Sequence, residues 1–316
     1  MKKILFAFIL LINTLCWAQY PNRPVRVIVP FGPGGGNDII ARIVSQELST
    51  MWNVPVIVEN KPGADSLIGS EFVAKAAPDG YTLLVNMRAA VAAAQAIRTN
   101  NQFDWETDLI TVGFMGWQPP FVVVTSSKNK ITTLEELKKL GQTRGLTFGS
   151  AGAGGALHLY GEELARVLNI KGIHVPYKST LPALLDVINN NTDFIVAPLG
   201  QANQHIASGA LTLLAIADDS PSPLFPGVPT VQSLGYSTFP TLNVTFNFIA
   251  PRGLPVNLQK KIGEDVATAV QSLHKQLIDR KLIDERKPAP AFENINTVNT
   301  RNEKQYYSLS KKYIEK

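Results

Sequence analysis

Apolar residues in the first hundred positions follow two alternating periods. Short apolar runs bounded by turn residues predict three strands, at residues 25–29, 54–60 and 81–86. The stretches after these runs repeat apolar residues at helical spacing and predict helices, at residues 39–48, 67–77 and 89–97. Strands separated by helices usually pair in parallel through right-handed crossovers. The first part of the chain is therefore predicted to form a parallel α/β sheet.

The alternation begins again after the two prolines at residues 119–120. Five further apolar runs predict strands, at residues 121–125, 146–150, 173–177, 193–197 and 211–217. Helical spacing predicts helices between them, at residues 132–141, 156–168 and 180–189, and one that ends at Gly209. In the first of these helices, Thr132 and Glu135 are the expected capping box and Gly141 is the expected end.

The last part of the chain follows a stretch rich in Pro and Ser at residues 218–229. Its pattern predicts one strand and two helices, at residues 242–250, at 258–273 and from Phe292 onward. Together these elements predict an α/β protein with two lobes, of which the second interrupts the first. We place the lobes at residues 19–120 plus 242–316 and at residues 121–241. A ligand is expected in a cleft between them.

The N-terminus has the features of a secretory signal peptide. Two lysines precede an apolar run at residues 4–15 that is too short to span a bilayer, and a fitting cleavage site ends at Ala18. We predict that residues 1–18 are removed and that the mature protein is exported. The alternative is a lipoprotein signal that uses Cys16. Removal of the signal would take away Cys16, the only cysteine, and with it any disulfide or cysteine metal ligand.

The charge of the chain is mildly basic and is spread along its length. There are 30 Lys and Arg residues against 25 Asp and Glu residues, a formal net charge of +5. No run of basic residues is suited to following a nucleic-acid backbone. We therefore expect no nucleic-acid partner.

A glycine-rich turn joins the first predicted strand to the first predicted helix. It spans residues 32–36 and is followed by Asn37 and Asp38. Such a turn aims unpaired backbone N–H groups and the positive end of a helix dipole at a bound anion. Glycine also serves wherever φ must be positive, so one turn is weak evidence. A second turn, AGAGG at residues 151–155, falls in the other lobe, and the two predict a pair of anion-binding nests.

Two charged residues stand near the expected site, Asp38 in the first turn of the first predicted helix and Arg88 at the end of the third predicted strand. Asp38 suits the helix dipole, yet its charge would oppose an anion placed too close. We expect its side chain to close the turn or to hold a water molecule. Arg88 offers a fork of donors suited to a second carboxylate, and the alternative is a solvated surface arginine.

The motifs of nucleotide-binding proteins and hydrolases are absent. No Lys follows the first glycine cluster as a Walker motif requires, and no GxGxxG spacing fits either turn. Ser150 lies in FGSAG rather than in GxSxG. The four histidines are far apart in the sequence and form neither a zinc motif nor a local triad. A catalytic site assembled in space stays open, and His158 is interpreted as capping or packing near the second turn.

Seven segments of the chain are characteristic in their order and combination. They are RPVRVIVPFGPGGGNDIIARIVSQEL, VIVENKPGADSLIGSEFVAKAAPDGYTLL, FGSAGAGGALHL, VPYKSTLPALLDVINNNTDF, HIASGALTLLAIA, LFPGVPTVQSLGY and FIAPRGLP. In this order they resemble the extracytoplasmic solute receptors of the tripartite tricarboxylate transporter family, also called Bug receptors. The resemblance covers nearly the whole mature chain.

The resemblance implies a two-lobed periplasmic-binding-protein fold, of type II-like architecture, that closes over a small organic acid. It implies a monomer that delivers this carboxylate to membrane permease subunits, with no catalytic residue, no metal and no cofactor. A sensory receptor that docks on a signalling partner is the alternative, and a secreted hydrolase is a further one.

In similar receptors the two glycine turns hold one carboxylate of the ligand. Carried over by motif, this role falls on residues of both turns: Phe31, Gly34, Gly35, Gly36, Asn37, Asp38, Ser150, Ala151, Gly152, Gly154 and Ala156. Three departures from the family pattern concern specificity. Ala197 stands where many relatives have an acidic residue, which favours a plain mono- or dicarboxylate over a ligand with an ammonium group. Small residues are common near Arg88 in relatives, so an arginine there is expected to add a second carboxylate clamp. Thr245 stands where relatives often have a tryptophan.

Overall fold

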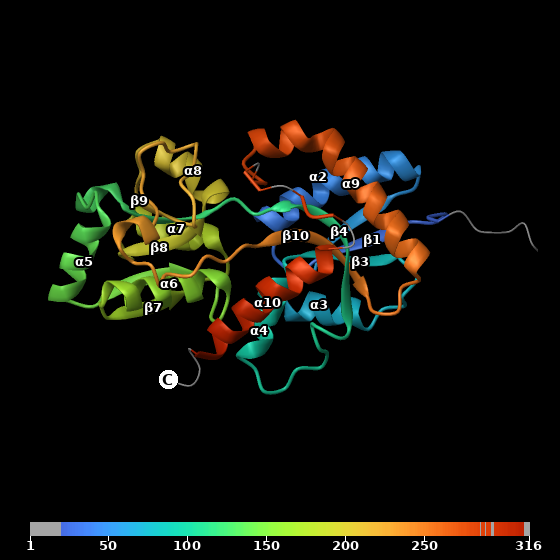
Figure 1. The fold of residues 1–316 in the computed structure, drawn as a ribbon, viewed down its shortest axis with the longest axis horizontal. Coiled ribbons are helices and arrows are strands. Elements are labelled where there is room, and N and C mark those ends of the chain that lie inside the picture. Colours follow the sequence, from blue (N-terminus) through green and yellow to red (C-terminus); the bar gives the residue numbers. More distant parts are fainter. Residues whose placement is uncertain (1–19, 285, 288, 292–293, 313–316) are drawn as a thin grey trace, which may run out of the picture.

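The computed structural model describes residues 20–284, 286–287, 289–291 and 294–312, so the predicted signal peptide lies outside the described residues. The described chain forms two five-stranded sheets in an elongated molecule (Figure 1). The first sheet has the order β2-β1-β3-β10-β4, with β1 Val25–Val29, β2 Val56–Asn60, β3 Thr82–Asn86, β4 Leu109–Trp117 and β10 Thr245–Pro251. The second has the order β7-β6-β8-β5-β9, with β5 Phe121–Ser126, β6 Leu146–Ser150, β7 Gly172–Pro176, β8 Phe194–Pro198 and β9 Leu211–Ala217. We call the first sheet with its helices the first lobe, and the second sheet with its helices the second lobe.

Helices cover both sheets. Those of the first lobe are α2 Gly36–Trp52, α3 Leu67–Ala74, α4 Arg88–Ala96 and α9 Val256–Asp279. Those of the second lobe are α5 Leu134–Thr143, α6 Ala156–Leu168, α7 Thr180–Ile188 and α8 Leu199–Ala207. The C-terminal helix is α10 Ile295–Lys312, and two 3-10 helices are Ser127–Asn129 and Gln232–Leu234. In Figure 1, α2 and α9 lie on one side of the first sheet, and α3, α4 and α10 lie on the other.

Apolar spacing explains why α2 forms where it does. Ile40, Val44 and Leu48 recur every four residues and are fully buried in the cluster that contains β1. The helix ends at Asn53, which adopts the left-handed conformation that asparagine tolerates. This packing fixes the start of α2 directly above the carboxyl end of β1, which positions the first glycine turn.

The pairing of the strands confirms the parallel sheet predicted for the first three strands, and it adds antiparallel strands to both sheets. β1 pairs in parallel with β2 and β3, and β6 pairs in parallel with β7 and β8, as predicted. However, β10 is antiparallel to β3 and β4, and β5 is antiparallel to β8 and β9. β5 enters the second lobe and β10 returns to the first, so neither is reached through the strand–helix–strand crossover that produces parallel pairing.

The sequence pattern missed β4 altogether. Gly113 and Gly116 interrupt its apolar alternation, but packing requires both of them. A methyl group built on Gly113 would lie 2.9 Å from the Val266 side chain on α9, and one on Gly116 would lie 2.4 Å from Ile283. Because α9 and Ile283 approach β4 so closely, the strand carries glycines where apolar side chains would have indicated a strand.

The beginning of α5 corrects the predicted capping box by one residue. The N-cap is Thr133, whose hydroxyl accepts a hydrogen bond from Glu136 N, while the Glu136 carboxylate accepts one from Thr133 N. The predicted end at Gly141 is also wrong. Gly141 lies inside the helix, where a methyl group would lie 2.6 Å from Ile170, so it is a packing glycine rather than a cap.

Helix α10 contacts both lobes (Figure 1). Near its start, Asn296 Oδ1 accepts a hydrogen bond from Thr111 N on β4. Near its end, Tyr306 is buried in the core cluster of the second lobe, and Lys312 Nζ lies 2.9 Å from Glu163 Oε1 on α6. The helix therefore spans the junction of the two lobes. None of the helices in the described part of the chain is long and apolar enough to cross a membrane.

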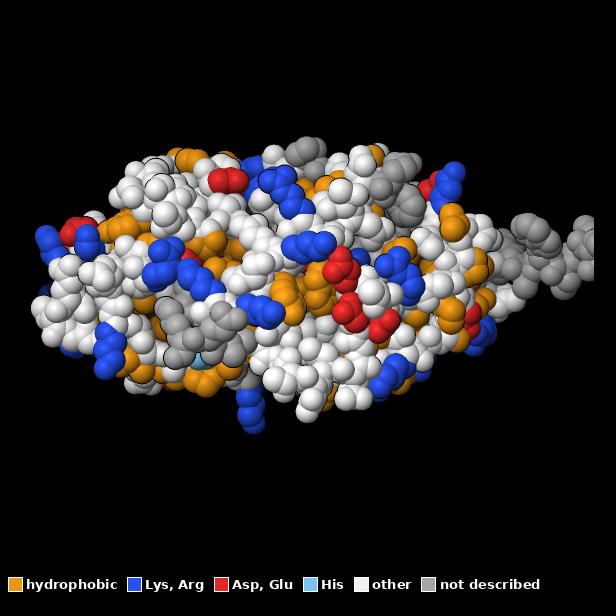
Figure 2. Space-filling model, turned by 60° about the horizontal axis from the view of Figure 1, so that its bottom comes forward, with side chains coloured by type: hydrophobic (Ala, Val, Ile, Leu, Met, Phe, Trp, Pro, Cys, Tyr) orange, Lys and Arg blue, Asp and Glu red, His pale blue; other side chains and the backbone are white. Residues whose placement is uncertain are grey.

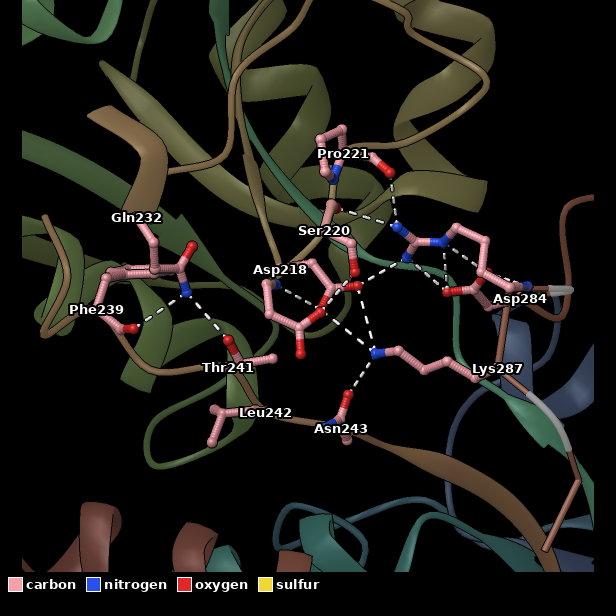
Figure 3. Close-up of polar contacts among 12 residues, drawn as sticks. Asp218, Ser220, Pro221, Gln232, Phe239, Thr241, Leu242, Asn243, Asp284 and Lys287 are labelled. Carbon is pink, nitrogen blue, oxygen red and sulfur yellow. Dashed lines mark hydrogen bonds and ion pairs between the residues drawn. The ribbon is translucent and has the colours of Figure 1, made fainter. Parts of the chain in front are cut away.

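A charged cluster lies beside the links between the lobes (Figure 3). Asp218, which follows β9, is 2.7 Å from Arg286 Nη2 and 3.3 Å from Lys287 Nζ, both of which follow α9. Lys287 also donates a hydrogen bond to Asn243. These contacts join residues that follow elements of different lobes, next to the hydrogen bond from Gln118 N to Val244 O.

Candidate functional site

The two glycine turns have nearly identical backbone conformations. Gly34 has φ +84° and Gly154 has φ +85°, values that favour glycine. The residues after them are the N-caps of α2 and α6, and both are extended, with φ/ψ of −78°/166° at Gly35 and −75°/172° at Gly155. The turns after β1 and β6 are thus two copies of one structural device, in different lobes.

A side chain four residues further on closes each turn in the same way. Gly34 N donates to Asp38 Oδ2 over 2.9 Å, and Gly154 N donates to His158 Nδ1 over 2.9 Å. The expected roles of Asp38, closing the turn, and of His158, capping it, are confirmed. Burial acts to raise the pKa of Asp38, but hydrogen bonds from Arg42, Gly34 and Asn60 outweigh it and hold the pKa below its usual value.

The closing bonds leave a defined set of backbone donors for a ligand. The N–H groups of Gly34, Gly152 and Gly154 are occupied by the side chains of Asp38, Ser150 and His158. These N–H groups are thus engaged within the turns, and contacts of these three glycines with a ligand stay a prediction. The first N–H groups of each helix have no intrahelical acceptor, and neither Gly35 nor Gly155 has a side chain that caps them. The candidate donors are the backbone N–H groups of residues 36–38 and 156–158.

Each turn lies against a residue of the opposite lobe. A methyl group built on Gly36 would lie 3.9 Å from Gln201 Nε2 on α8. One on Gly152 would lie 2.5 Å from Asp65 Oδ1, and one on Gly154 would lie 1.8 Å from Ile97 Cδ1. Gln201, Asp65 and Ile97 were not predicted as site residues. No local pattern indicates that their side chains face the opposite lobe.

The other predicted residues of the turns differ in their contacts. The carbonyl of Phe31 accepts a hydrogen bond from Asn60 Nδ2, which also donates to Asp38. Asn37 is buried, and its side-chain Oδ1 has no hydrogen-bond partner among the described residues. Ala151 and Ala156 lie within and just after the second turn and are partly exposed. They stay candidate ligand contacts through their backbone.

A serine and two histidines meet beneath the second turn. Ser150 Oγ lies 2.6 Å from His174 Nε2, and the His174 and His158 rings stack with centroids 3.9 Å apart. The histidines that are far apart in the sequence are thus adjacent in space, which the sequence could not show. Burial and the neighbouring His158 lower the pKa of His174 to about 4, so this imidazole is neutral near pH 7. Ser150 is fully buried and also donates to Gly152 O, so the pair builds the turn and is closed to a substrate.

Arg88 does not lie where the predicted second clamp requires it. Its guanidinium is buried, with Nε 3.1 Å from Glu303 Oε1 on α10 and Nη2 donating to Trp105 O over 3.0 Å. Both predicted readings, ligand clamp and solvated surface residue, are therefore wrong. Burial raises the pKa of Glu303 to about 7, although the Arg88 guanidinium opposes this rise.

Two further residues that were predicted to affect specificity are also buried in the protein core. Ala197 is fully buried in the cluster formed by β5, β8 and α7, so its side chain offers no contact to a ligand. Thr245 is buried and donates to Asn299 Oδ1 over 2.7 Å. These residues shape the interior of the lobes instead of the ligand site.

Other possible sites are poor competitors. Among the described residues, no group of His, Cys, Asp or Glu could hold a metal ion. A surface hollow of about 660 Å³ is lined by residues such as Asp104, Glu106 and Tyr307, and no residue of either glycine turn contributes to it. Lys and Arg side chains are scattered over the face drawn in Figure 2. The absence of a nucleic-acid partner stays a prediction.

Comparison with known proteins assigns the family. The family model described as "Tripartite tricarboxylate transporter family receptor" matches residues 40–284. The chain belongs to this receptor family. Protein BugT of Bordetella pertussis is 33% identical to this receptor over 257 residues, which cover 80% of this chain and 78% of BugT.

Solved structures show the same fold. The periplasmic binding protein BugD matches this receptor with a TM-score of 0.81 at 26% identity, covering 93% of this chain and 98% of BugD. MatC from Rhodopseudomonas palustris, solved with bound malate, matches with a TM-score of 0.81 at 24% identity, covering 92% and 100%. The predicted two-lobed binding-protein fold is thus confirmed. The family consists of solute-binding receptors and not of enzymes, so the hydrolase reading is set aside.

Proposed function

We propose that this receptor binds a small mono- or dicarboxylate in the periplasm and delivers it to the permease subunits of a tripartite tricarboxylate transporter. The observation that carries the proposal is the pair of matching turns, each of which ends in a helix N-terminus with uncapped backbone donors. One turn belongs to each lobe, so a ligand held by both would favour the closed arrangement of the lobes. The malate bound to MatC, a relative in fold, supports a carboxylate as the ligand.

Backbone donors can supply the required affinity without a positively charged side chain. Hydrogen bonds to a charged group contribute about 1.5–3 kcal/mol each. Four such bonds would together contribute about 6–12 kcal/mol, a range that includes the roughly 8 kcal/mol of micromolar binding. We propose the backbone of residues 36–38 and 156–158 as these donors, with Gln201 contributing from across the interface between the lobes.

A thermal-shift screen against a panel of mono- and dicarboxylates, followed by calorimetry, tests this proposal. A ligand that binds only the folded state raises the unfolding temperature with its concentration. We expect stoichiometric binding of at least one acid, without turnover of that acid. Failure of every acid to shift the unfolding temperature at millimolar concentration would contradict the carboxylate assignment.

Delivery to a permease needs a separate experiment. The receptor added to proteoliposomes with the large and small permease subunits should stimulate uptake of the acid found in the screen. A receptor that binds the acid but stimulates no uptake would favour the sensory alternative. We also propose that the receptor is a monomer and that its lobes are divided at residues 120/121 and 241/242.

A further inference from the structure

The segment Ala64–Ser66 carries backbone strain where the lobes meet. Its three residues have φ of +48°, +51° and +79°, the left-handed region that residues other than glycine rarely adopt. A glycine at any of these positions would relieve the strain. Residues held in this conformation cluster at ligand-binding sites, where their side chains serve a purpose.

Asp65 points across the interface between the lobes at the second turn. Its Oδ1 lies so close to Gly152 that a methyl group there would be 2.5 Å away. Its Oδ2 lies 2.9 Å from Arg98 Nη2, and Arg98 is itself anchored by a 2.8 Å hydrogen bond from Nη1 to Ala94 O. Arg98 donates to Oδ2, while Oδ1 faces the second turn. An oriented acceptor oxygen thus lies beside the turn that we assign to the carboxylate.

Ser66 follows Asp65 in the same strained segment. The residue is 1% exposed, and its hydroxyl has no hydrogen-bond partner among the described residues. The contact with the second turn therefore comes from Asp65.

We propose that Asp65 is a specificity-determining residue that selects 2-hydroxy carboxylates over their deoxy analogues. This inference rests on the proposed function. The ligand carboxylate accepts hydrogen bonds from the backbone donors of the turns, and its 2-hydroxyl donates to Asp65 Oδ1. Arg98 neutralises the Asp65 charge, so the acceptor suits a neutral hydroxyl rather than an ammonium group and does not repel the adjacent carboxylate.

The chemistry predicts a large discrimination. A site that forms a hydrogen bond with a hydroxyl group of its ligand binds an analogue without that hydroxyl group less tightly. A hydrogen bond to a charged group corresponds to at least about a tenfold difference in affinity. We therefore expect each hydroxy acid to bind at least about tenfold more tightly than its deoxy partner.

Calorimetric titration of matched acid pairs tests the inference. The pairs are malate with succinate, 2-hydroxyglutarate with glutarate, and lactate with propionate, and the measured quantity is the ratio of dissociation constants within each pair. The variant Asp65→Gly removes the acceptor and also relieves the backbone at φ +51°, so it should fold. We expect the ratio to fall from tenfold or more in the wild type to between one and three in Asp65→Gly.

Two further variants act as controls. Asp65→Asn keeps an acceptor oxygen and tolerates the left-handed conformation, so it should retain part of the ratio. Asp279→Asn removes an equivalent charge from an exposed ion pair with Lys275 on α9 and should leave the ratio unchanged. Thermal unfolding of each variant shows that it is folded.

The outcomes separate this inference from the proposed function. An unchanged ratio in Asp65→Gly, a wild type that binds succinate as tightly as malate, or tighter binding of aspartate than of malate would each overturn the role of Asp65 while leaving a carboxylate receptor. If none of these six acids binds the wild type but another acid of the screen does, the role of Asp65 is overturned and the proposed function stands. If no acid of the screen binds, both fail.

Discussion

Substitution of Gly35 by aspartate should separate binding from stability. Gly35 is the N-cap of α2, with an extended backbone at φ −78° that any residue can adopt. A Cβ at this position would meet nothing closer than Gly32 O at 3.9 Å. Aspartate is a favoured N-cap, because its carboxylate accepts hydrogen bonds from the first N–H groups of the helix. The folded state should therefore be stabilised by a few tenths of a kcal/mol, with a further contribution from the helix dipole of about 0.3–1 kcal/mol.

The same carboxylate would occupy the donors that we assign to the ligand. Its charge would lie about 5 Å from the ligand carboxylate, which costs about 3 kcal/mol at an effective dielectric constant near 20. This cost alone corresponds to a loss of affinity of more than about 100-fold. The variant should thus bind poorly while it unfolds at an unchanged or higher temperature.

Calorimetry with the tightest acid from the screen, together with thermal unfolding, measures both effects. Gly35→Asn places a similar N-cap oxygen without the charge, and Gly35→Ala adds only a methyl group. We expect the loss of affinity to increase in the order Ala, Asn, Asp. An aspartate variant with the affinity of the wild type would refute the assignment of these backbone donors to the ligand.

Three other predictions concern the interface between the lobes, the histidine pair and the buried ion pair. Gly154→Ala should weaken binding, because its methyl group would lie 1.8 Å from Ile97. The added change Ile97→Ala should restore part of the affinity, as measured by calorimetry. A double variant that binds no better than Gly154→Ala would contradict this clash. Because the pKa of His174 is lowered to about 4 from an ordinary value near 6.5, the unfolded state binds more protons between these pH values. The free energy of unfolding, measured with urea, should therefore fall as the pH drops from about 6.5 to 4. It should fall less in His174→Phe. An equal pH dependence of the unfolding free energy in the two proteins would contradict the lowered pKa. Arg88→Ala should destabilise the fold by about 3 kcal/mol, because it leaves Glu303 buried without its partner. The variant should change the affinities for mono- and dicarboxylates equally. A selective loss of affinity for dicarboxylates would show that Arg88 contacts a second carboxylate of the ligand.

The sequence predicted the scaffold of the site well because that scaffold is local. β1 was predicted with its observed bounds, and the start of α6 at Ala156 was predicted from the spacing that follows the second turn. The turn-closing roles of Asp38 and His158 were also accessible, since each acts on a residue four positions away. Local periodicity and turn chemistry carry this information.

Contacts between distant segments could not be predicted. The partner of Arg88 is Glu303 on the C-terminal helix, so nothing near Arg88 in the sequence indicates that its guanidinium turns inward. The same holds for Asp65 beside Gly152 and for His174 beside Ser150. β4 was missed because its glycines are required by packing against α9 and Ile283, which periodicity does not register.

The central claim is that one ligand engages both glycine turns at the same time. Nuclear magnetic resonance of protein labelled with 15N-glycine measures this directly, through the backbone amide signals of Gly35 and Gly36 in one turn and of Gly154 and Gly155 in the other. We predict that the signals of both turns shift together during titration with the acid and saturate at one equivalent. Shifts confined to a single turn, or saturation of the two turns at different ligand concentrations, would contradict the account.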